Sequence, residues 1–287
     1  MGLIVGILMV IGCTLGGYMA MGGKLGVLWQ PFEVVIIVGS AIGAYIISNP
    51  ASVLKSTGGA IGKTLKGAQF KKEHYLELLQ LLYQLLKVAK TKGNLGLEQH
   101  IENPQDSALF QQFPGVMAND TAITFICDYL RMLTLGSDSP HEMEALMDEE
   151  IELVHHEHSE TAHALQTMAD GMPALGIVAA VLGVIKTMGS ITEPPEILGK
   201  LIGGALVGTF LGVWVSYGFV GPIASKAQSV YDAEIKFLHC IKAALLAHMH
   251  GSAPAVSVEF ARKALVGHER PTFYEVEEAV GALPPVS

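Results

Sequence analysis

The chain has 287 residues, of which half are apolar and 16% are charged, and its formal net charge is −9. Long stretches contain no charged residue at all, which excludes an ordinary soluble globular protein. The segments that do carry charge are acidic overall, so they provide no basic surface that would favour nucleic acid as a partner.

Four stretches are apolar and long enough to cross a bilayer. They cover residues 1–22, 32–48, 171–191 and 201–222. Because a hydrocarbon core of about 30 Å is spanned by roughly 20 helical residues, each stretch predicts a membrane span. The first has no charged leader and no small-x-small cleavage pattern, so we interpret it as a retained span and not a signal peptide. We predict an all-α polytopic membrane protein with four transmembrane helices and a helical cytoplasmic domain.

Lysine is distributed unevenly around these spans. Residues 51–92 contain eight lysines, whereas the two short turns between spans contain only Lys24 and Lys200. Positively charged loops stay on the cytoplasmic side, so the lysine-rich segment and both termini are predicted to be cytoplasmic. The predicted layout is a membrane hairpin over 1–48, a cytoplasmic domain over 49–170, a second membrane hairpin over 171–222 and cytoplasmic C-terminal helices over 223–287.

The segments outside the membrane are predicted to be helical. Leucines at helical spacing indicate an amphipathic helix over 75–89, and a second helix is predicted over 119–134. Residues 141–170 contain neither Pro nor Gly, so one helix of about 45 Å is expected to run into the third span. The fourth span is expected to continue past Pro222 to residue 250. Shorter helices are predicted near 255–266 and 272–280, followed by a mobile tail over 281–287.

Ionisable side chains are nearly absent from the predicted spans, where they are costly and are tolerated mainly for function. Lys186 lies near the outer end of the third span, and there we favour extension of its ammonium to the surface over a gating role. Glu33 closely follows Pro31 and is predicted to be interfacial. The chain is therefore expected to lack a mid-membrane carboxylate of its own.

Glycines recur at four-residue spacing in the spans, a pattern that lets helix backbones approach closely. The spacing is equally compatible with packing inside one chain and with contact between copies. The glycines concerned include Gly12, Gly16, Gly39, Gly43, Gly176, Gly199, Gly203, Gly204, Gly208 and Gly212.

Two prolines and one threonine stand out in the second hairpin. Pro173 and Pro222 each remove a backbone donor and free the carbonyl four residues earlier, at Ala169 and Gly218. Such a matched pair fits hinges and helix-end features equally well. The Thr209 hydroxyl lies in the middle of the fourth span, where it can bond to its own helix or solvate a passing ion.

A histidine cluster invites a metal interpretation, which we disfavour. Its members lie on one acidic helix, whereas carboxylate-bridged metal sites take Glu-x-x-His motifs from two helices. No nucleophile elbow, phosphate loop or zinc spacing occurs elsewhere, so we expect neither an enzyme nor a cofactor or metal site. The histidines are His155, His156, His158 and His163.

Several long blocks of sequence stand in one order along the chain: GGYMAMGGKLGVLWQPFEVVIIVGSAIGAYI, IENP from Ile101, FICDYLRM from Phe125, EALMDEEIE from Glu144, MPALGIVAAVLGV from Met172, LVGTFLGVWVSYGFVGP from Leu206, VEFARKAL and ERPTF. Together these blocks resemble the MotA family of bacterial flagellar stator subunits. The resemblance implies an inner-membrane ring of five such chains, embedded in lipid, around two copies of a MotB-like partner. That single-span, peptidoglycan-binding partner supplies the intramembrane aspartate, and ion flow past it rotates the ring.

The resemblance also implies roles for individual residues. Pro173, Thr209 and Pro222 fall on positions that line or gate the ion path. Sodium-type relatives carry a threonine at the position of Ala180, which offers no ligand here, so the transported ion is predicted to be H⁺.

Three charged positions are implied to act below the membrane. Lys90 and Glu98 fall on the pair that engages the rotor protein FliG, and Glu150 falls on a further acidic position. The family's usual residue at position 90 is arginine, and lysine keeps the charge but loses the planar, bidentate fork.

Two alternatives belong to other classes. A TolQ- or ExbB-like energiser of another envelope system shares the chemistry of the third and fourth spans, but it generally has three spans, and the early hairpin through Tyr45 argues against it. A non-conducting membrane scaffold fits the glycine rows alone. A stand-alone transporter would need an intramembrane ionisable site of its own.

Overall fold

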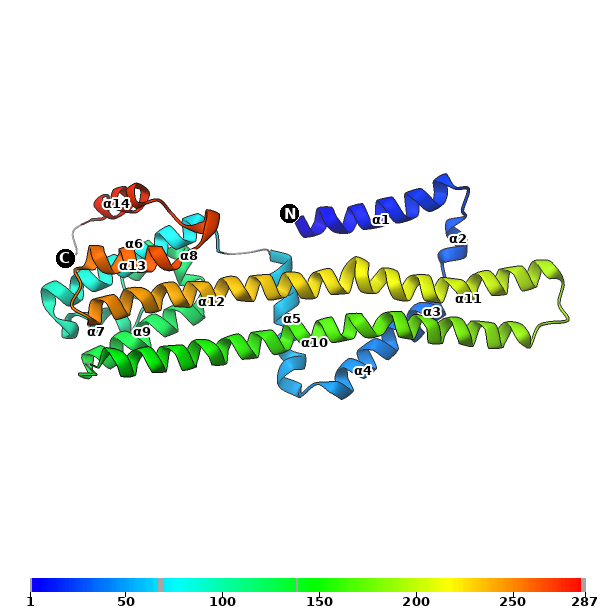
Figure 1. Cartoon of the computed structure of the whole chain (residues 1–287), viewed down its shortest axis with the longest axis horizontal. Coiled ribbons are helices and arrows are strands. Elements are labelled where there is room, and N and C mark those ends of the chain that lie inside the picture. The colour runs from blue at the N-terminus through cyan, green and yellow to red at the C-terminus, as the bar shows by residue number, and fades with distance from the viewer. Residues whose placement is uncertain (1, 67–69, 138, 285–287) are drawn as a thin grey trace. The chain divides into compact units, whose positions relative to one another are not determined.

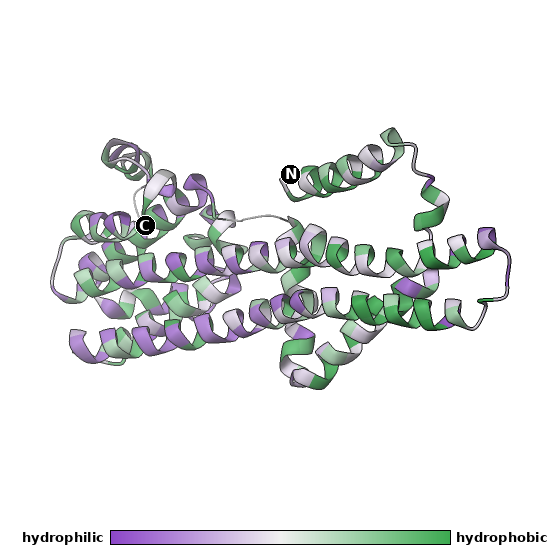
Figure 2. Ribbon diagram, turned by 45° about the vertical axis from the view of Figure 1, so that its right-hand side comes forward, coloured by the Kyte–Doolittle hydropathy of each residue, from purple (hydrophilic) through white to green (hydrophobic). Residues whose placement is uncertain are grey.

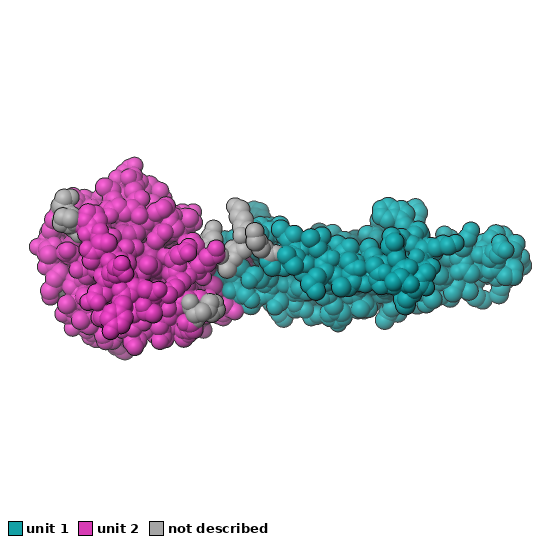
Figure 3. Space-filling model, turned by 90° about the horizontal axis from the view of Figure 1, so that it is seen from above, with its two compact units in different colours: residues 1–67, 157–230 teal, residues 68–156, 231–287 magenta. Residues whose placement is uncertain are grey.

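The computed structural model describes residues 2–66, 70–137 and 139–284, which form helices and no strand (Figure 1). The predicted all-α fold is therefore confirmed. The chain forms two compact units, Met1–Gly67 with Glu157–Val230 and Ala68–His156 with Tyr231–Ser287 (Figure 3). These units divide the chain at other points than the predicted membrane boundaries after residues 48, 170 and 222. Met1, at the start of the predicted first span, and residues 285–287 of the predicted tail lie outside the described residues.

Unit 1 contains the four helices that are long and apolar enough to cross a membrane, which confirms four candidate spans. Figure 2 colours the ribbon by residue hydropathy and shows hydrophobic residues recurring along these helices. Its elements are α1 (Gly2–Ala20), α2 (Leu25–Leu28), α3 (Pro31–Val34), the π-helical η1 (Val35–Gly39), α4 (Ser40–Ser48), α5 (Ala51–Lys66), the second part of α10 (Pro140–Met188), α11 (Pro195–Val215), the π-helical η4 (Ser216–Val220) and the start of α12 (Gly221–Met249).

The turn between α10 and α11 is shorter than the predicted spans imply. Helix α10 ends at Met188 and α11 already begins at Pro195. Proline is well suited to the first helical position, because its missing N–H has no intrahelical partner there. The helix thus starts ahead of the predicted span start at residue 201.

Helices α10 and α11 of unit 1 touch through backbone atoms. A Cβ built on Gly176 would lie 2.9 Å from the Gly208 carbonyl oxygen and 3.0 Å from the Gly212 Cα. Packing within one chain is therefore the role of these glycines. In the first hairpin, a Cβ built on Gly12, Gly16, Gly39 or Gly43 would have no atom within 4 Å.

Unit 2 is built around α6, whose apolar face is fully buried, as the leucine spacing over 75–89 predicts. The Asn119 side chain caps α9 by accepting a hydrogen bond from the Ala122 N–H at 3.2 Å, and Thr272 caps α14. The elements are α6 (Lys72–Lys92), η2 (Asn94–Leu97), α7 (Glu98–Ile101), η3 (Phe110–Gln112), α8 (Pro114–Met117), α9 (Asp120–Thr134), the first part of α10, the rest of α12, α13 (Pro254–Ala264), η5 (Gly267–Glu269) and α14 (Phe273–Gly281).

The contact between α10 and α11 predicts the effect of a single methyl group. Gly176→Ala should destabilise the chain by about 1–3 kcal/mol, because the added Cβ meets backbone atoms that cannot rotate away. Gly171→Ala, on the same helix, is the matched control, since a Cβ there meets nothing within 4 Å. Thermal unfolding of the detergent-purified chain measures both, and equal midpoints for the two variants would contradict the close approach.

Two buried tyrosines of unit 2 should respond differently to the removal of their hydroxyl. The Tyr129 hydroxyl donates to Glu150 Oε2 at 2.7 Å, whereas the Tyr75 hydroxyl has no hydrogen-bond partner among the described residues. Tyr129→Phe should therefore cost about 1–2 kcal/mol and Tyr75→Phe close to nothing. The stability of the two variants can be compared by heating each one and measuring the cleavage of unit 2 by a protease. An equal loss of stability in both variants would contradict the expected difference.

Candidate functional site

Thr209 and Ala180 lie at one level of the α10–α11 pair. Gly208 precedes Thr209, and a Cβ on Gly208 would lie 3.1 Å from the Ala180 amide nitrogen. Thr209 and Ala180 are both half-buried. The structure therefore places these two predicted ion-path residues at one level of the helix pair, where the backbones of Gly208 and Ala180 are close.

Glu33 packs against α11. Its Oε2 would be 2.9 Å from a Cβ on Gly208, within the predicted span over 201–222, and Gln30 occupies the corresponding space beside Gly204. The missing side chains of these two glycines leave room for α3 to lie over α11. Glu33 thus packs against the predicted fourth span, while its interfacial position and the lack of a mid-membrane carboxylate stay predictions. Glu33 Oε2 is buried and has no hydrogen-bond partner among the described residues.

Pro173 lies inside the continuous helix α10, and the carbonyl it frees has found a partner. The Ser216 hydroxyl donates to the Ala169 carbonyl oxygen at 2.6 Å, and both residues are buried. A buried carbonyl without a donor would cost about 1–3 kcal/mol. Sequence reasoning missed this role of Ser216, because a hydroxyl near the end of a span usually bonds to its own helix.

Pro222 follows a π-helical turn and not a regular α-helix. The Gly221 N–H donates to the Ser216 carbonyl, five residues earlier. This turn includes Gly218, whose carbonyl is predicted to be freed by Pro222, and this stays a prediction. A π-helical turn is a common way for a helix to absorb an irregularity at a functional position.

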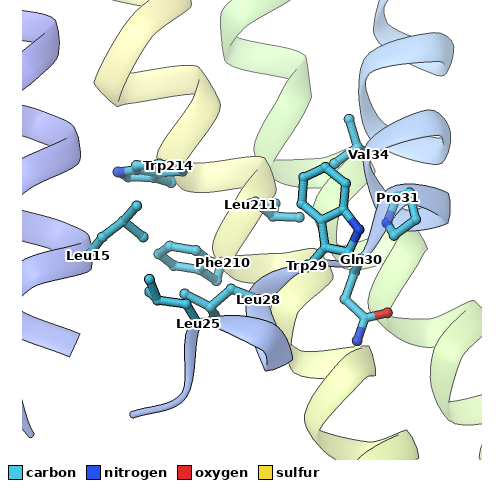
Figure 4. A pocket seen from close by; sticks show the side chains of 10 residues that line it. All are labelled: Leu15, Leu25, Leu28, Trp29, Gln30, Pro31, Val34, Phe210, Leu211 and Trp214. Atoms are coloured by element: carbon cyan, nitrogen blue, oxygen red, sulfur yellow. The ribbon is translucent and has the colours of Figure 1, made fainter. Parts of the chain in front are cut away.

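An apolar cavity of about 510 Å³ lies beside α11 in unit 1 (Figure 4). It is bounded by α1, α2, α3 and α11, and apart from Gln30 its lining side chains are aliphatic or aromatic. The Trp214 Nε1 donates to Thr14 Oγ1 at 3.1 Å, which ties α11 to α1 next to it. Its lining suits hydrocarbon and not an ion; the residues are Leu15, Leu25, Leu28, Trp29, Gln30, Pro31, Val34, Phe210, Leu211 and Trp214.

Lys90 and Glu98 are exposed on either side of one turn in unit 2. Lys90 lies in the last turn of α6 and Glu98 begins α7, and Gly93 between them has a φ of 76°, which favours glycine. Neither charge takes part in an ion pair within the described part of the chain. The structure therefore leaves both charges available to another molecule.

Glu150 belongs to a different set of contacts. It lies on α10, is half-buried and accepts the hydrogen bond from Tyr129. This bond and burial both raise the pKa of the Tyr129 phenol. For the histidine cluster on α10, the described residues contain no group of three or more His, Cys, Asp or Glu side chains placed to hold a metal ion.

Comparison with known proteins covers almost the whole chain. Residues 4–93 match the Motility protein A N-terminal family model, and residues 118–240 match that of the MotA/TolQ/ExbB proton channel family. Motility protein A of Escherichia coli strain K12 is 42% identical over 281 residues, which are 98% of this chain and 95% of that protein. The chemotaxis protein LafT of Vibrio parahaemolyticus is 37% identical over 95% of this chain and 96% of its own length.

Two solved structures have the same fold. The flagellar MotAB stator complex from Bacillus subtilis matches with a TM-score of 0.74 at 24% identity, over 94% of this chain and 98% of that chain. The C. jejuni MotAB structure matches with a TM-score of 0.78 at 19% identity, over 92% and 95%. The chain belongs to the motility protein A members of the MotA/TolQ/ExbB proton channel family.

Proposed function

We propose that this chain is a flagellar stator subunit that, with a MotB-like partner, couples inward proton flow to rotation and transmits torque to the rotor. The observation that carries the proposal is the α10–α11 pair, which holds Thr209 and Ala180 at one level and joins the Pro173 region to the segment before Pro222. This pair lies within the match to the proton channel family. The separate match over residues 4–93 favours a motility protein over a TolQ- or ExbB-like energiser.

The partner is proposed to be a single-span, peptidoglycan-binding subunit, with five copies of this chain around two of the partner. The solved relatives are named as MotAB structures. Helix α1 buries none of its residues within this chain, and Gly12, Gly16, Gly39 and Gly43 of the first hairpin have open space around them. Open apolar faces of this kind suit contact with lipid and with other membrane helices. The lysine distribution supports an inner-membrane orientation with both termini in the cytoplasm.

Protons are the proposed ion, because the side chain of Ala180 provides no oxygen ligand. Its amide nitrogen lies near Gly208, so a hydroxyl would have to come from Thr209 on the facing helix. A sodium ion needs several oxygen ligands at fixed distances, whereas a proton can be passed along single hydrogen-bonding groups.

Proton use predicts that rotation is independent of sodium. In a stator-deficient host carrying this chain and its MotB-like partner, swimming speed at fixed pH should stay nearly unchanged when sodium is replaced by potassium, because a proton-driven complex draws no energy from the sodium gradient. Collapse of the proton gradient by an uncoupler should stop the cells. A stop on sodium withdrawal would reject proton use, and a complex that conducts nothing would favour the scaffold.

The exposed pair Lys90 and Glu98 is proposed to engage complementary charges on the rotor protein FliG. Neither charge has an ion pair within the described residues, and the two lie on either side of the turn that contains Gly93. Lys90 presents a point charge where relatives have the arginine fork, so a single ionic contact is expected in place of a bidentate one. Glu150 is proposed to act mainly by holding α9 to α10 through Tyr129.

Charge reversal should test this surface. Lys90→Glu is expected to reduce tethered-cell torque several-fold, because it places like charges opposite each other, whereas Lys90→Arg should preserve or increase torque. Lys236→Glu makes the same charge change at an exposed position of α12 in unit 2 and should leave torque nearly unchanged. An equal loss in Lys90→Glu and Lys236→Glu would place the effect in net charge and not in rotor contact.

A further inference from the structure

Within the described residues, a side-chain hydrogen bond of Ser216 links the region around Pro173 to the region before Pro222. Its hydroxyl donates to Ala169 O at 2.6 Å, the carbonyl that Pro173 leaves without its normal donor. Its own carbonyl accepts the Gly221 N–H in the π-helical turn directly before Pro222. One residue is thus bonded to both irregular segments.

The direction of this hydrogen bond is unusual for a hydroxyl in an apolar helix. Some other hydroxyls of unit 1 bond to the carbonyl four residues earlier in their own helix, as Ser48 does to Ala44 and Thr187 to Gly183, each at 2.8 Å. Ser216 instead reaches a carbonyl 47 residues away on α10. A serine that only satisfied its own hydroxyl would have the same local option as the others.

The surroundings hold the two helices at the distance this bond needs. A Cβ on Gly212, one turn before Ser216, would lie 2.8 Å from both the Met172 carbonyl oxygen and the Gly176 Cα. Gln166 lies 3.9 Å from the corresponding position on Gly221. Ser216 is fully buried, so water cannot replace its hydroxyl without a separation of the helices.

We propose that Ser216 is a positioning residue of the ion-driven cycle, whose hydroxyl latches the carbonyl freed by Pro173 to the π-helical turn before Pro222. A change of conformation at either proline must then break or remake this hydrogen bond, which couples the two positions. The inference rests on the proposed stator function for its role in the cycle, but the latch itself is a property of the helix pair.

Ser216→Ala removes the latch with the loss of a single oxygen atom. In the complete complex with the MotB-like partner, amide hydrogen exchange over residues 169–177 and 216–224 should become roughly five-fold faster, the effect of losing one net hydrogen bond on a local opening equilibrium. Ser216→Cys, which has nearly the same size and a weaker donor, should fall between Ser216→Ala and the unmodified chain. Ser48→Ala removes a hydroxyl that bonds within its own helix and should leave both segments unchanged.

Rotation provides the second measurement. The curve of rotation speed against proton-motive force should differ between Ser216→Ala and the unmodified complex, because the latch sets the balance between conformations. The curve of Ser216→Cys should lie between these two. If amide exchange in Ser216→Ala equals that of the unmodified complex, the latch is overturned. It is also overturned if Ser48→Ala accelerates exchange as much as Ser216→Ala does. If Ser216→Ala did not assemble, Ser216→Cys exchange equal to the unmodified complex would also overturn it.

The two proposals fail in different ways. A complex of unmodified chains that neither conducts protons nor rotates would refute the stator function, while the exchange comparison would still decide the latch. A complex that rotates, but whose speed and amide exchange are unchanged by Ser216→Ala, would refute the latch and leave the stator function standing.

Discussion

The close approach of α10 and α11 is the contact on which the rest of unit 1 depends. Where a Cβ would come within 3 Å of the opposite backbone, only glycine allows the two helices to meet. In hydrocarbon there is no hydrophobic force to press helices together, so this backbone contact must be achieved by packing alone. It also brings Ser216 within reach of Ala169, while Gly204 and Gly208 of the same helix leave the space that Gln30 and Glu33 occupy.

Irregular backbone in a membrane needs internal partners, and the structure provides them at the point of use. Pro173 interrupts helical hydrogen bonding where water is absent, and the Ser216 hydroxyl replaces the lost donor. The π-helical turn η4 lies next to Pro222 and contains Ser216 at its start. The two irregularities are therefore parts of one arrangement and not two isolated helix defects.

The helical framework could be predicted because its signals are local. Apolar stretches of sufficient length indicate the spans, leucine spacing indicates α6, and Asn119 and Thr272 mark helix starts that the structure confirms as caps. Helix α5 was not predicted, because its glycines and lysines give a weak pattern on their own. The Ser216 bond and the position of Glu33 could not be predicted from single segments. Both arise from pairs of helices far apart in sequence, and which glycines face a partner is a property of the pair.

The distribution of unsatisfied groups separates structural from functional residues. Ala169, freed by Pro173, is satisfied inside the chain, as is the Glu150 carboxylate by Tyr129. Glu33 Oε2 has no hydrogen-bond partner in the described part of the chain, and Lys90 and Glu98 have no ion pair there. Burying an unpaired carboxylate oxygen is expensive, so its retention needs a benefit that this chain alone does not provide. The unsatisfied Glu33 oxygen of unit 1 is best explained by a partner that another chain supplies, which is the condition a subunit of a membrane motor has to meet.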